Sequence, residues 1–254
     1  MPERKVFLAF PCYGLVHFEA VEACYRACAQ TPVAFYRSSD SRLPHNFNKL
    51  WCAALNSRQQ HRWSHFAMLH SDVAPETHWL DMLIDEQERL GVDVMAAVIP
   101  IKDSRGLTST GVWNPETGQV RRLTMAEVMQ LPETFTADEV ADLLQPQQRV
   151  RVDMPLLVNS GCWVCRWNTF WPEKVVWRFV DEIWQSEDGR FQARTMSEDW
   201  DMSRQMAELD LKVAATRKVL VVHYGSEGWS NAKVWGDYQE DPGDAYSNPF
   251  QGSP

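Results

Sequence analysis

The sequence has a deficit of positive charge and lacks the long apolar runs of a membrane protein. Its 25 lysine and arginine residues face 34 aspartate and glutamate residues, so the net charge is −9. Non-specific nucleic-acid binding needs a basic surface, so this balance argues against that class but leaves a local basic groove open. No apolar run approaches the roughly 18 residues of a membrane span. The first residues also lack the apolar segment and cleavage site of a signal peptide, so we expect a cytoplasmic location.

The common metal and nucleotide motifs are also missing. Six cysteines are present. Cys162 and Cys165 have C-x-x-C spacing without a second pair, and Cys24 and Cys28 are four apart on an expected helix. We interpret both pairs as structural. No G-x-G-x-x-G or P-loop pattern occurs, which excludes the usual dinucleotide and P-loop sites.

The stretch that organises the sequence is residues 66–73, Phe-Ala-Met-Leu-His-Ser-Asp-Val. A short apolar run between helix-like segments is typical of a buried parallel strand. Open α/β sheets bind ligands beyond the carboxyl ends of their strands, which would place Asp72 in a crevice. The alternative is that Asp72 only caps the following segment.

The first hundred residues alternate between strand-like and helix-like segments. The expected strands are 6–10, 33–36, 66–69 and 94–99, and the expected helices are 17–29, 43–58 and 79–90, the last ended by Gly91. This alternation predicts parallel strands of the nucleotide-binding kind. Right-handed crossovers would bring residues 11–14, residues 38–42 and Asp72 to one rim of the sheet.

The second half is less regular. The expected elements are a hairpin of 108–113 and 119–123, a helix opened by a capping box at Thr124, an insertion or lid at 132–151 with a helix at 138–144, a strand at 162–166, a helix at 172–184, a loop at 185–195, a helix from Ser197 to about 209, and strands at 213–216 and 219–222.

Three stretches together resemble the GT-A fold glycosyltransferases, in particular the family-2-like enzymes that use nucleotide sugars. They are His70-Ser71-Asp72, Glu198-Asp199 and His223. The first is similar to the family's D-x-D motif, with histidine in the first place. The resemblance implies an α/β fold with a single GT-A-like domain, built on a Rossmann-like mixed sheet flanked by helices. It implies a catalytic domain at 1–225, with a nucleotide-binding half at 1–100 and an acceptor half at 101–225 that includes an insertion at about 124–151. Residues 226–254 would form a C-terminal tail or flap.

The resemblance also implies roles for individual residues. Asp72 and His223 would hold a divalent metal, Mn²⁺ or Mg²⁺. Asp199 would be the catalytic base, with Glu198 orienting the acceptor or substituting for it. The expected nucleotide-sugar contacts are Pro11, Tyr13, Gly14, Ser39, Asp40, Arg42, Asn48, His70, Ser71, Asp72, Gly161 and Trp163.

These residue types suit glycosyl transfer. A divalent cation between the phosphates makes a nucleoside diphosphate a better leaving group, and Mn²⁺ accepts both carboxylate and imidazole ligands. A carboxylate that removes the proton of the acceptor hydroxyl makes it nucleophilic, which implies an inverting enzyme. The expected donor is a UDP- or GDP-sugar, and the acceptor is a saccharide, a small molecule or a modified DNA base.

Three other functions remain open from the sequence. One is glycosyl transfer to a hydroxymethylated base in phage-type DNA. Another is a non-catalytic nucleotide-sugar-binding module, suggested by histidine in the first place of the D-x-D motif. The third is nucleotidyl transfer, which would favour a glycine-rich basic loop after the first strand. Residues 11–14 do not have that composition.

Overall fold

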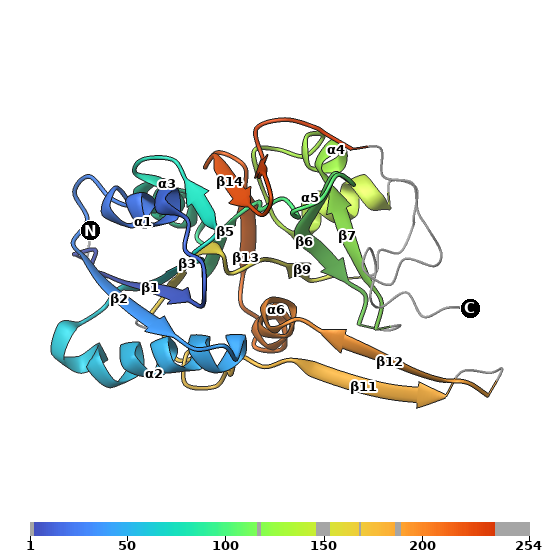
Figure 1. The fold of residues 1–254 in the computed structure, drawn as a ribbon, viewed down its shortest axis with the longest axis horizontal. Coiled ribbons are helices and arrows are strands. Elements are labelled where there is room, and N and C mark those ends of the chain that lie inside the picture. The colour runs from blue at the N-terminus through green and yellow to red at the C-terminus, as the bar shows by residue number, and fades with distance from the viewer. Residues whose placement is uncertain (1–2, 116–117, 146–152, 168, 186–188, 237–254) are drawn as a thin grey trace.

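The computed structural model describes residues 3–115, 118–145, 153–167, 169–185 and 189–236. A mixed sheet of seven strands, in the order β2-β1-β3-β10-β5-β13-β8, runs through the protein. Helices flank it, with α1 and α3 above the first strands and α2 below them (Figure 1). The fold is therefore a Rossmann-like mixed α/β domain, as predicted.

The helices are α1 (Phe18–Tyr25), α2 (Leu43–His61), α3 (Trp79–Leu90), α4 (Met125–Val128), α5 (Ala137–Leu144) and α6 (Glu198–Glu208). The strands are β1 (Val6–Cys12), β2 (Val33–Ser39), β3 (His65–Leu69), β4 (Val73–Pro75), β5 (Val94–Ala97), β6 (Leu107–Trp113), β7 (Val120–Thr124), β8 (Thr134–Phe135), β9 (Leu156–Leu157), β10 (Cys162–Arg166), β11 (Val180–Gln185), β12 (Phe191–Met196), β13 (Val213–Thr216), β14 (Val221–Tyr224) and β15 (Gly228–Ser230).

The strands β1, β2 and β3 pair in parallel, and β10 adds antiparallel pairs to the sheet. β1 pairs in parallel with both β2 and β3. β10 then lies antiparallel between β3 and β5, and β13 is parallel to β5 on its other edge. The ends of β1, β2 and β3 consequently share one rim.

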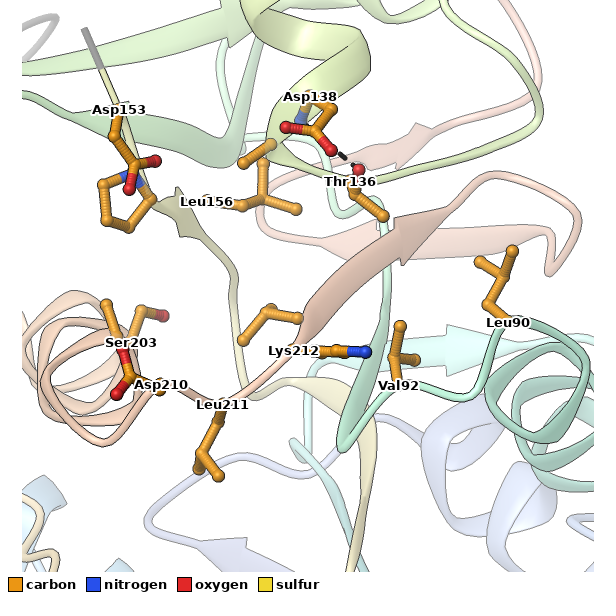
Figure 2. A pocket seen from close by; sticks show the side chains of 14 residues that line it. Leu90, Val92, Thr136, Asp138, Asp153, Leu156, Ser203, Asp210, Leu211 and Lys212 are labelled. Carbon is orange, nitrogen blue, oxygen red and sulfur yellow. Dashed lines mark hydrogen bonds between the residues drawn. The ribbon is translucent and has the colours of Figure 1, made fainter.

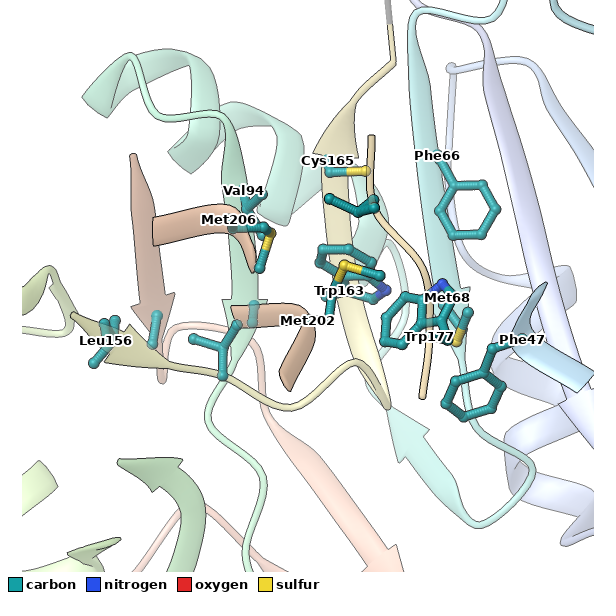
Figure 3. Close-up of a cluster of buried hydrophobic side chains, with 14 of the residues drawn as sticks. Phe47, Phe66, Met68, Val94, Leu156, Trp163, Cys165, Trp177, Met202 and Met206 are labelled. Carbon is teal, nitrogen blue, oxygen red and sulfur yellow. The ribbon is translucent and has the colours of Figure 1, made fainter. Parts of the chain in front are cut away.

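Alternation along each central strand divides the core into two layers. Phe7 and Ala9 of β1 pack in the layer that contains Phe47 and Trp51 of α2. The intervening residues of β1 pack in the other layer, with side chains of α1 and α3. Figure 3 shows part of the first layer, in which Phe66 and Trp163 come from neighbouring strands. Because side chains of a strand point alternately to opposite faces, a strand buried on both faces is apolar throughout.

The expected helix at 172–184 is wrong. Residues 175–179 have no regular secondary structure and lead into β11, with Val175 and Trp177 buried and Val176 exposed between them. The Asn48 amide donates to the Trp177 carbonyl and accepts from the Trp177 N–H, at 2.7 and 3.0 Å. Gln205 of α6 does the same for Val176, at 2.8 and 3.0 Å. These amides satisfy backbone groups that a helix would otherwise pair internally, so contacts with residues distant in sequence favour a non-helical segment.

The expected loop at 185–195 is also wrong, because part of it is β12. β11 and β12 form a two-stranded antiparallel hairpin. It extends away from the rest of the chain (Figure 1). Ile183 and Phe191 are largely exposed on it.

Two smaller sheets complete the architecture. β6 pairs with β7, which confirms the expected hairpin, and β9 joins its other edge. β14 lies between β4 and β15. The capping box at Thr124 is present, and Gly91 ends α3 in the left-handed conformation at φ 68°.

The division into nucleotide-binding and acceptor halves stays a prediction. Residues 146–152 of the expected insertion and 237–254 of the expected tail lie outside the described residues. Within the part of the chain that the structure describes, no helix has both the length and the apolar character needed to cross a membrane.

Candidate active site

The loop after β3 and the strand β14 bring Asp72 and His223 together. β4 begins at Val73, and β14 pairs antiparallel with it so that His223 lies opposite Val73. The Tyr224 N–H donates to the Asp72 carbonyl at 2.8 Å. His223 Nε2 consequently lies 3.4 Å from Asp72 Oδ2.

Asp72 is surrounded by cationic or ionisable groups. Lys102 Nζ lies 2.5 Å from Asp72 Oδ2, and the Asp72 side chain is 29% exposed. Burial by itself would raise the pKa of Asp72. The hydrogen bond and charge of His223, together with His70 and Lys102, outweigh burial and bring the pKa well below its usual range. Asp72 is therefore a carboxylate at neutral pH.

The orientation of His223 leaves one ring nitrogen available. Its Nδ1 lies 2.7 Å from the Pro100 carbonyl, which can only accept, so Nδ1 is the donor. In the neutral ring, Nε2 then carries the lone pair and faces Asp72. Metal-binding histidines commonly have this arrangement, with the second nitrogen donating to a carbonyl.

Asp199, in the first turn of α6, is held by neutral donors. Its Oδ2 accepts from the Asn159 amide at 2.7 Å, and its Oδ1 accepts from the Ser160 N–H at 3.3 Å and from the Ser160 hydroxyl. Because that hydroxyl donates to Asp199, it accepts from His70 Nε2, 3.3 Å away. His70, Ser160 and Asp199 therefore form one hydrogen-bonded chain.

Burial raises the pKa values of both acids at the start of α6. For Asp199, burial outweighs the lowering effects of the His70 charge and the Ser160 hydrogen bonds. For Glu198, burial and then the Asp199 charge raise the pKa to about 8. Glu198 and Asp199 are only 5% and 7% exposed. Acids with raised pKa values in a cleft are candidates for proton transfer.

A cavity of about 270 Å³ lies between these groups. Six of its lining residues are Lys102, Arg122, Asn159, Asp199, Trp200 and His223. Asp72 is not one of the lining residues, but two of them, Lys102 and His223, contact its carboxylate. The proposed base and the proposed metal ligand His223 therefore face one cavity, although they are 24 positions apart in sequence and lie on different elements.

The predicted nucleotide contacts at the ends of β1 and β2 lie along one rim. Pro11 is buried in β1 opposite Ser38 of β2. Beyond it, Tyr13 is 66% exposed and Gly14 adopts φ 71°. The remaining residues of this group are Ser39, Asp40 and Arg42, at the end of β2 and the start of α2.

Asp40 is already paired in this rim. The hydrogen bonds of Arg42 lower the pKa of Asp40 to about 2. Lys49 Nζ and His45 Nε2 lie 3.9 and 3.7 Å from the same carboxylate. Ser71 lies next to Asp72 in the loop after β3, and its carbonyl accepts from the His17 N–H at 2.9 Å.

The remaining predicted contacts lie further inside. Trp163 is 1% exposed and belongs to the core layer beneath α2 (Figure 3). Asn48 is occupied by the Trp177 backbone. The His70 ring packs against that of Phe47, with centroids 5.0 Å apart and the ring planes tilted by 39°. Trp163 is therefore a core side chain and Asn48 a partner of the backbone, whereas His70 directly follows the end of β3 at the rim, and the ligand contacts of all three stay predictions.

Gly161 also supports the site. A Cβ built on it would lie 2.6 Å from Asn159 Oδ1 and 3.2 Å from His70 Nδ1. The Gly161 carbonyl accepts from the His70 N–H at 2.9 Å. The missing side chain therefore lets β10 begin directly against the Asp199 network.

Sequence reasoning missed Lys102, Ser160 and Arg122. Lys102 follows the apolar run of β5, so its place after a strand was a usable signal. Ser160 directly precedes Gly161, which was one of the expected nucleotide-sugar contacts. Arg122 is on the outer hairpin strand β7, and no local pattern distinguishes it from its neighbour Arg121.

A larger cavity of about 480 Å³ lies away from this chemistry. Its lining includes Leu90, Thr136, Leu156 and Lys212, from α3, the residue before α5, β9 and the residue before β13 (Figure 2). None of the predicted site residues lines it. We therefore place the candidate active site at the smaller cavity.

Comparison with known proteins shows the fold and leaves the function open. No family model and no curated protein sequence matches the chain. Among solved structures, A197 from STIV is similar with a TM-score of 0.52 and 12% identity, over 92% of this chain and 94% of that chain. A protein assigned as a UDP-N-acetylglucosamine pyrophosphorylase from Entamoeba histolytica has a TM-score of 0.39 and 9% identity, over 84% of this chain and 73% of that chain. The first similarity shows a shared fold over nearly the whole chain, and the second is too weak to support an argument.

Proposed function

We propose that the protein is a glycosyltransferase with a GT-A-like site, which moves a sugar from a nucleoside diphosphate to an acceptor hydroxyl. One observation carries the proposal. Lys102 and His223, which contact the Asp72 carboxylate, line the same cavity as Asp199, whose pKa is raised by burial. Glycosyl transfer from a nucleotide sugar needs both carboxylates, one to manage diphosphate charge and one to accept a proton.

The first pair suits a divalent cation. Two ligands of one cation at about 2.1 Å lie roughly 3 to 3.5 Å apart, which agrees with the 3.4 Å between His223 Nε2 and Asp72 Oδ2. Among the described residues there is no group of three or more His, Cys, Asp or Glu that could hold a metal. The remaining positions would therefore go to phosphate oxygens and water, as is usual for Mg²⁺ and Mn²⁺ with nucleotides. When bound, the cation would neutralise the leaving diphosphate as a Lewis acid.

Asp199 would act on the acceptor. Its carboxylate accepts hydrogen bonds from Ser160 and Asn159. A carboxylate has about four lone-pair positions, so one remains for the acceptor hydroxyl. As the acceptor oxygen bonds to the anomeric carbon, the bond to the diphosphate breaks and Asp199 takes the hydroxyl proton. Attack from the face opposite the diphosphate inverts the anomeric centre.

A panel of UDP- and GDP-sugars incubated with Mn²⁺ tests the proposal through release of the nucleoside diphosphate. We expect turnover of at least one donor, and stimulation when the right acceptor is added. The proposal fails if no donor of either nucleoside is turned over and neither diphosphate binds.

One observation favours the alternative of a non-catalytic nucleotide-sugar-binding module. Lys102 Nζ already pairs with Asp72, and could neutralise a diphosphate without a metal. Binding of UDP or GDP sugars without turnover in the same panel would support that function.

A further inference from the structure

In the described part of the chain, Arg122 of β7 has no carboxylate partner. Its guanidinium lines the cavity and lies 4.1 Å from the centre of the Trp200 ring. Among the described residues its hydrogen-bond acceptor is the Thr108 carbonyl, 3.3 Å from Nη1. Its Nε is buried and has no partner in that part of the chain. A guanidinium has five N–H donors, so most of its capacity is unused.

The charge of Arg122 persists at neutral pH. Burial, helped by the nearby charge of Arg105, lowers its pKa to about 10, against the opposing effect of Asp103 and Asp199. Among the described residues, no carboxylate pairs with Arg122, and Asp103 is bound by Arg105 at 2.7 Å. A half-buried cation without a counter-charge is unfavourable, and an anionic ligand would supply that counter-charge.

Two other arginines show that an unpartnered Nε is not enough. Arg204 and Arg217 have the same feature. Arg204 even lies 4.7 Å from the centre of the Trp113 ring. Neither of them lines the cavity, whereas Arg122 does. Arg122 alone of the three combines spare donors with an open space.

The rest of the cavity suits one anionic sugar unit. Lys102, whose Nζ pairs with Asp72, adds a second basic group to the lining. Arg122 covers Trp200, so this indole does not offer a free face on which a neutral sugar could stack. The volume of about 270 Å³ is close to the lower end of ligand pockets, about 300 Å³.

We propose that Arg122 makes this cavity a subsite for a sugar that bears an oxyanion, either a carboxylate or a phosphate. The guanidinium fork matches both groups in a two-point hydrogen bond. That the ligand is a sugar rests on the proposed function. The inference adds that this sugar carries an anionic group. The anionic sugar can belong to the donor or to the acceptor.

Calorimetric titration of the full chain with glucuronate, glucose 6-phosphate and glucose tests the subsite. We expect at least one anionic sugar to bind about tenfold or more tightly than glucose, since hydrogen bonds to charged groups are the strong ones. Arg122→Gln should remove that preference, and Arg122→Lys should restore part of it. Arg204→Gln is the matched control, because it changes a similarly stacked arginine outside the cavity. Circular dichroism confirms that each variant is folded.

Two arms distinguish the sources of the anion. Tighter binding of UDP-glucuronate than of UDP-glucose, dependent on Arg122, assigns the oxyanion to the donor sugar. Binding of an anionic sugar in the presence of saturating UDP and Mn²⁺ assigns it to the acceptor. Either result supports the subsite.

Equal affinity for charged and neutral sugars in every arm overturns the inference. So does an equal loss of UDP and UDP-glucuronate affinity in Arg122→Gln, because Arg122 would then be a diphosphate contact. If an anionic sugar binds through Arg122 but neither UDP nor GDP binds, the oxyanion subsite is retained and the proposed function is the part that fails.

Discussion

Asp72 lies between a lysine and a histidine, whereas Asp199 is held by neutral hydrogen-bond donors in a more buried place. Lys102 and His223 contact the first carboxylate. Asn159 and Ser160 contact the second. The pKa of Asp72 is therefore lowered and that of Asp199 raised. Pairs of acids whose surroundings separate their pKa values are typical of sites that need one permanent anion and one proton acceptor.

The largest effect is expected when Asp199 loses its basicity. Asp199→Asn keeps the size of the side chain but cannot take a proton, so transfer should fall by about 10²- to 10⁴-fold. Nucleotide affinity should change little. Asp210→Asn, on an exposed residue beyond α6, is the control. Transfer within a few-fold of the wild type would move the base elsewhere, with Glu198 as the next candidate.

A smaller effect, on stability, is expected at Glu198. Its pKa of about 8 lies above its ordinary value of 4.5, so the folded protein binds a proton that the unfolded chain releases. Stability is then fully present below pH 4.5 and falls as the pH rises through about 8, by about 2 to 4 kcal/mol. Glu198→Gln should flatten this part of the stability profile in urea unfolding from pH 5 to 9.

Glu208→Gln is the matched control for that measurement, because Glu208 is exposed at the other end of α6. If the stability of Glu198→Gln falls with pH as steeply as that of the wild type and of Glu208→Gln, burial does not raise the pKa of Glu198.

Gly161→Ala tests the hydrogen bonds that hold Asp199. The added Cβ would meet Asn159 Oδ1 at 2.6 Å, which forces the donor of Asp199 to move. We expect a loss of about 1 to 3 kcal/mol in the free energy of unfolding, together with lower transfer activity. Unchanged stability and unchanged activity would mean that β10 can shift without disturbing the network.

The smallest effect is expected from Lys102→Met, on the Asp72 side. Removing the ammonium frees a carboxylate oxygen, so affinity for Mn²⁺ alone should rise about two- to fivefold, the worth of a partly exposed ion pair. Lys174→Met, on an exposed lysine outside the cavity, is the control. Titration followed by Mn²⁺ paramagnetic resonance measures the change, and weaker Mn²⁺ binding in Lys102→Met would show that Lys102 does not compete with the metal.

The first half of the fold could be predicted because its signals are local. Apolar strands alternate with helices there, and Gly91 marks the end of α3 at the expected residue. The segment after Trp171 could not be predicted, because its non-helical backbone is bound by Asn48 and Gln205, which are distant in sequence. Local pattern cannot reveal a backbone partner supplied by another helix.

In the candidate site, too, the sequence indicates the residues but not the contacts between them. Asp72, Asp199 and His223 lie next to strand and helix boundaries, where sequence patterns are informative. Their proximity depends on the pairing of β4 with β14 and on the loop before β10. The presence of Arg122 in the cavity depends on how the β6–β7 hairpin packs over Trp200, which no sequence periodicity specifies.

The most direct test of the account is calorimetric binding of UDP and GDP with and without Mn²⁺, in the wild type and in Asp72→Asn. We predict that at least one diphosphate binds, that Mn²⁺ strengthens its binding, and that Asp72→Asn removes the metal effect while leaving the protein folded. Metal-strengthened binding that survives unchanged in Asp72→Asn would contradict the proposed metal site. The absence of binding by both diphosphates would contradict the proposed function itself.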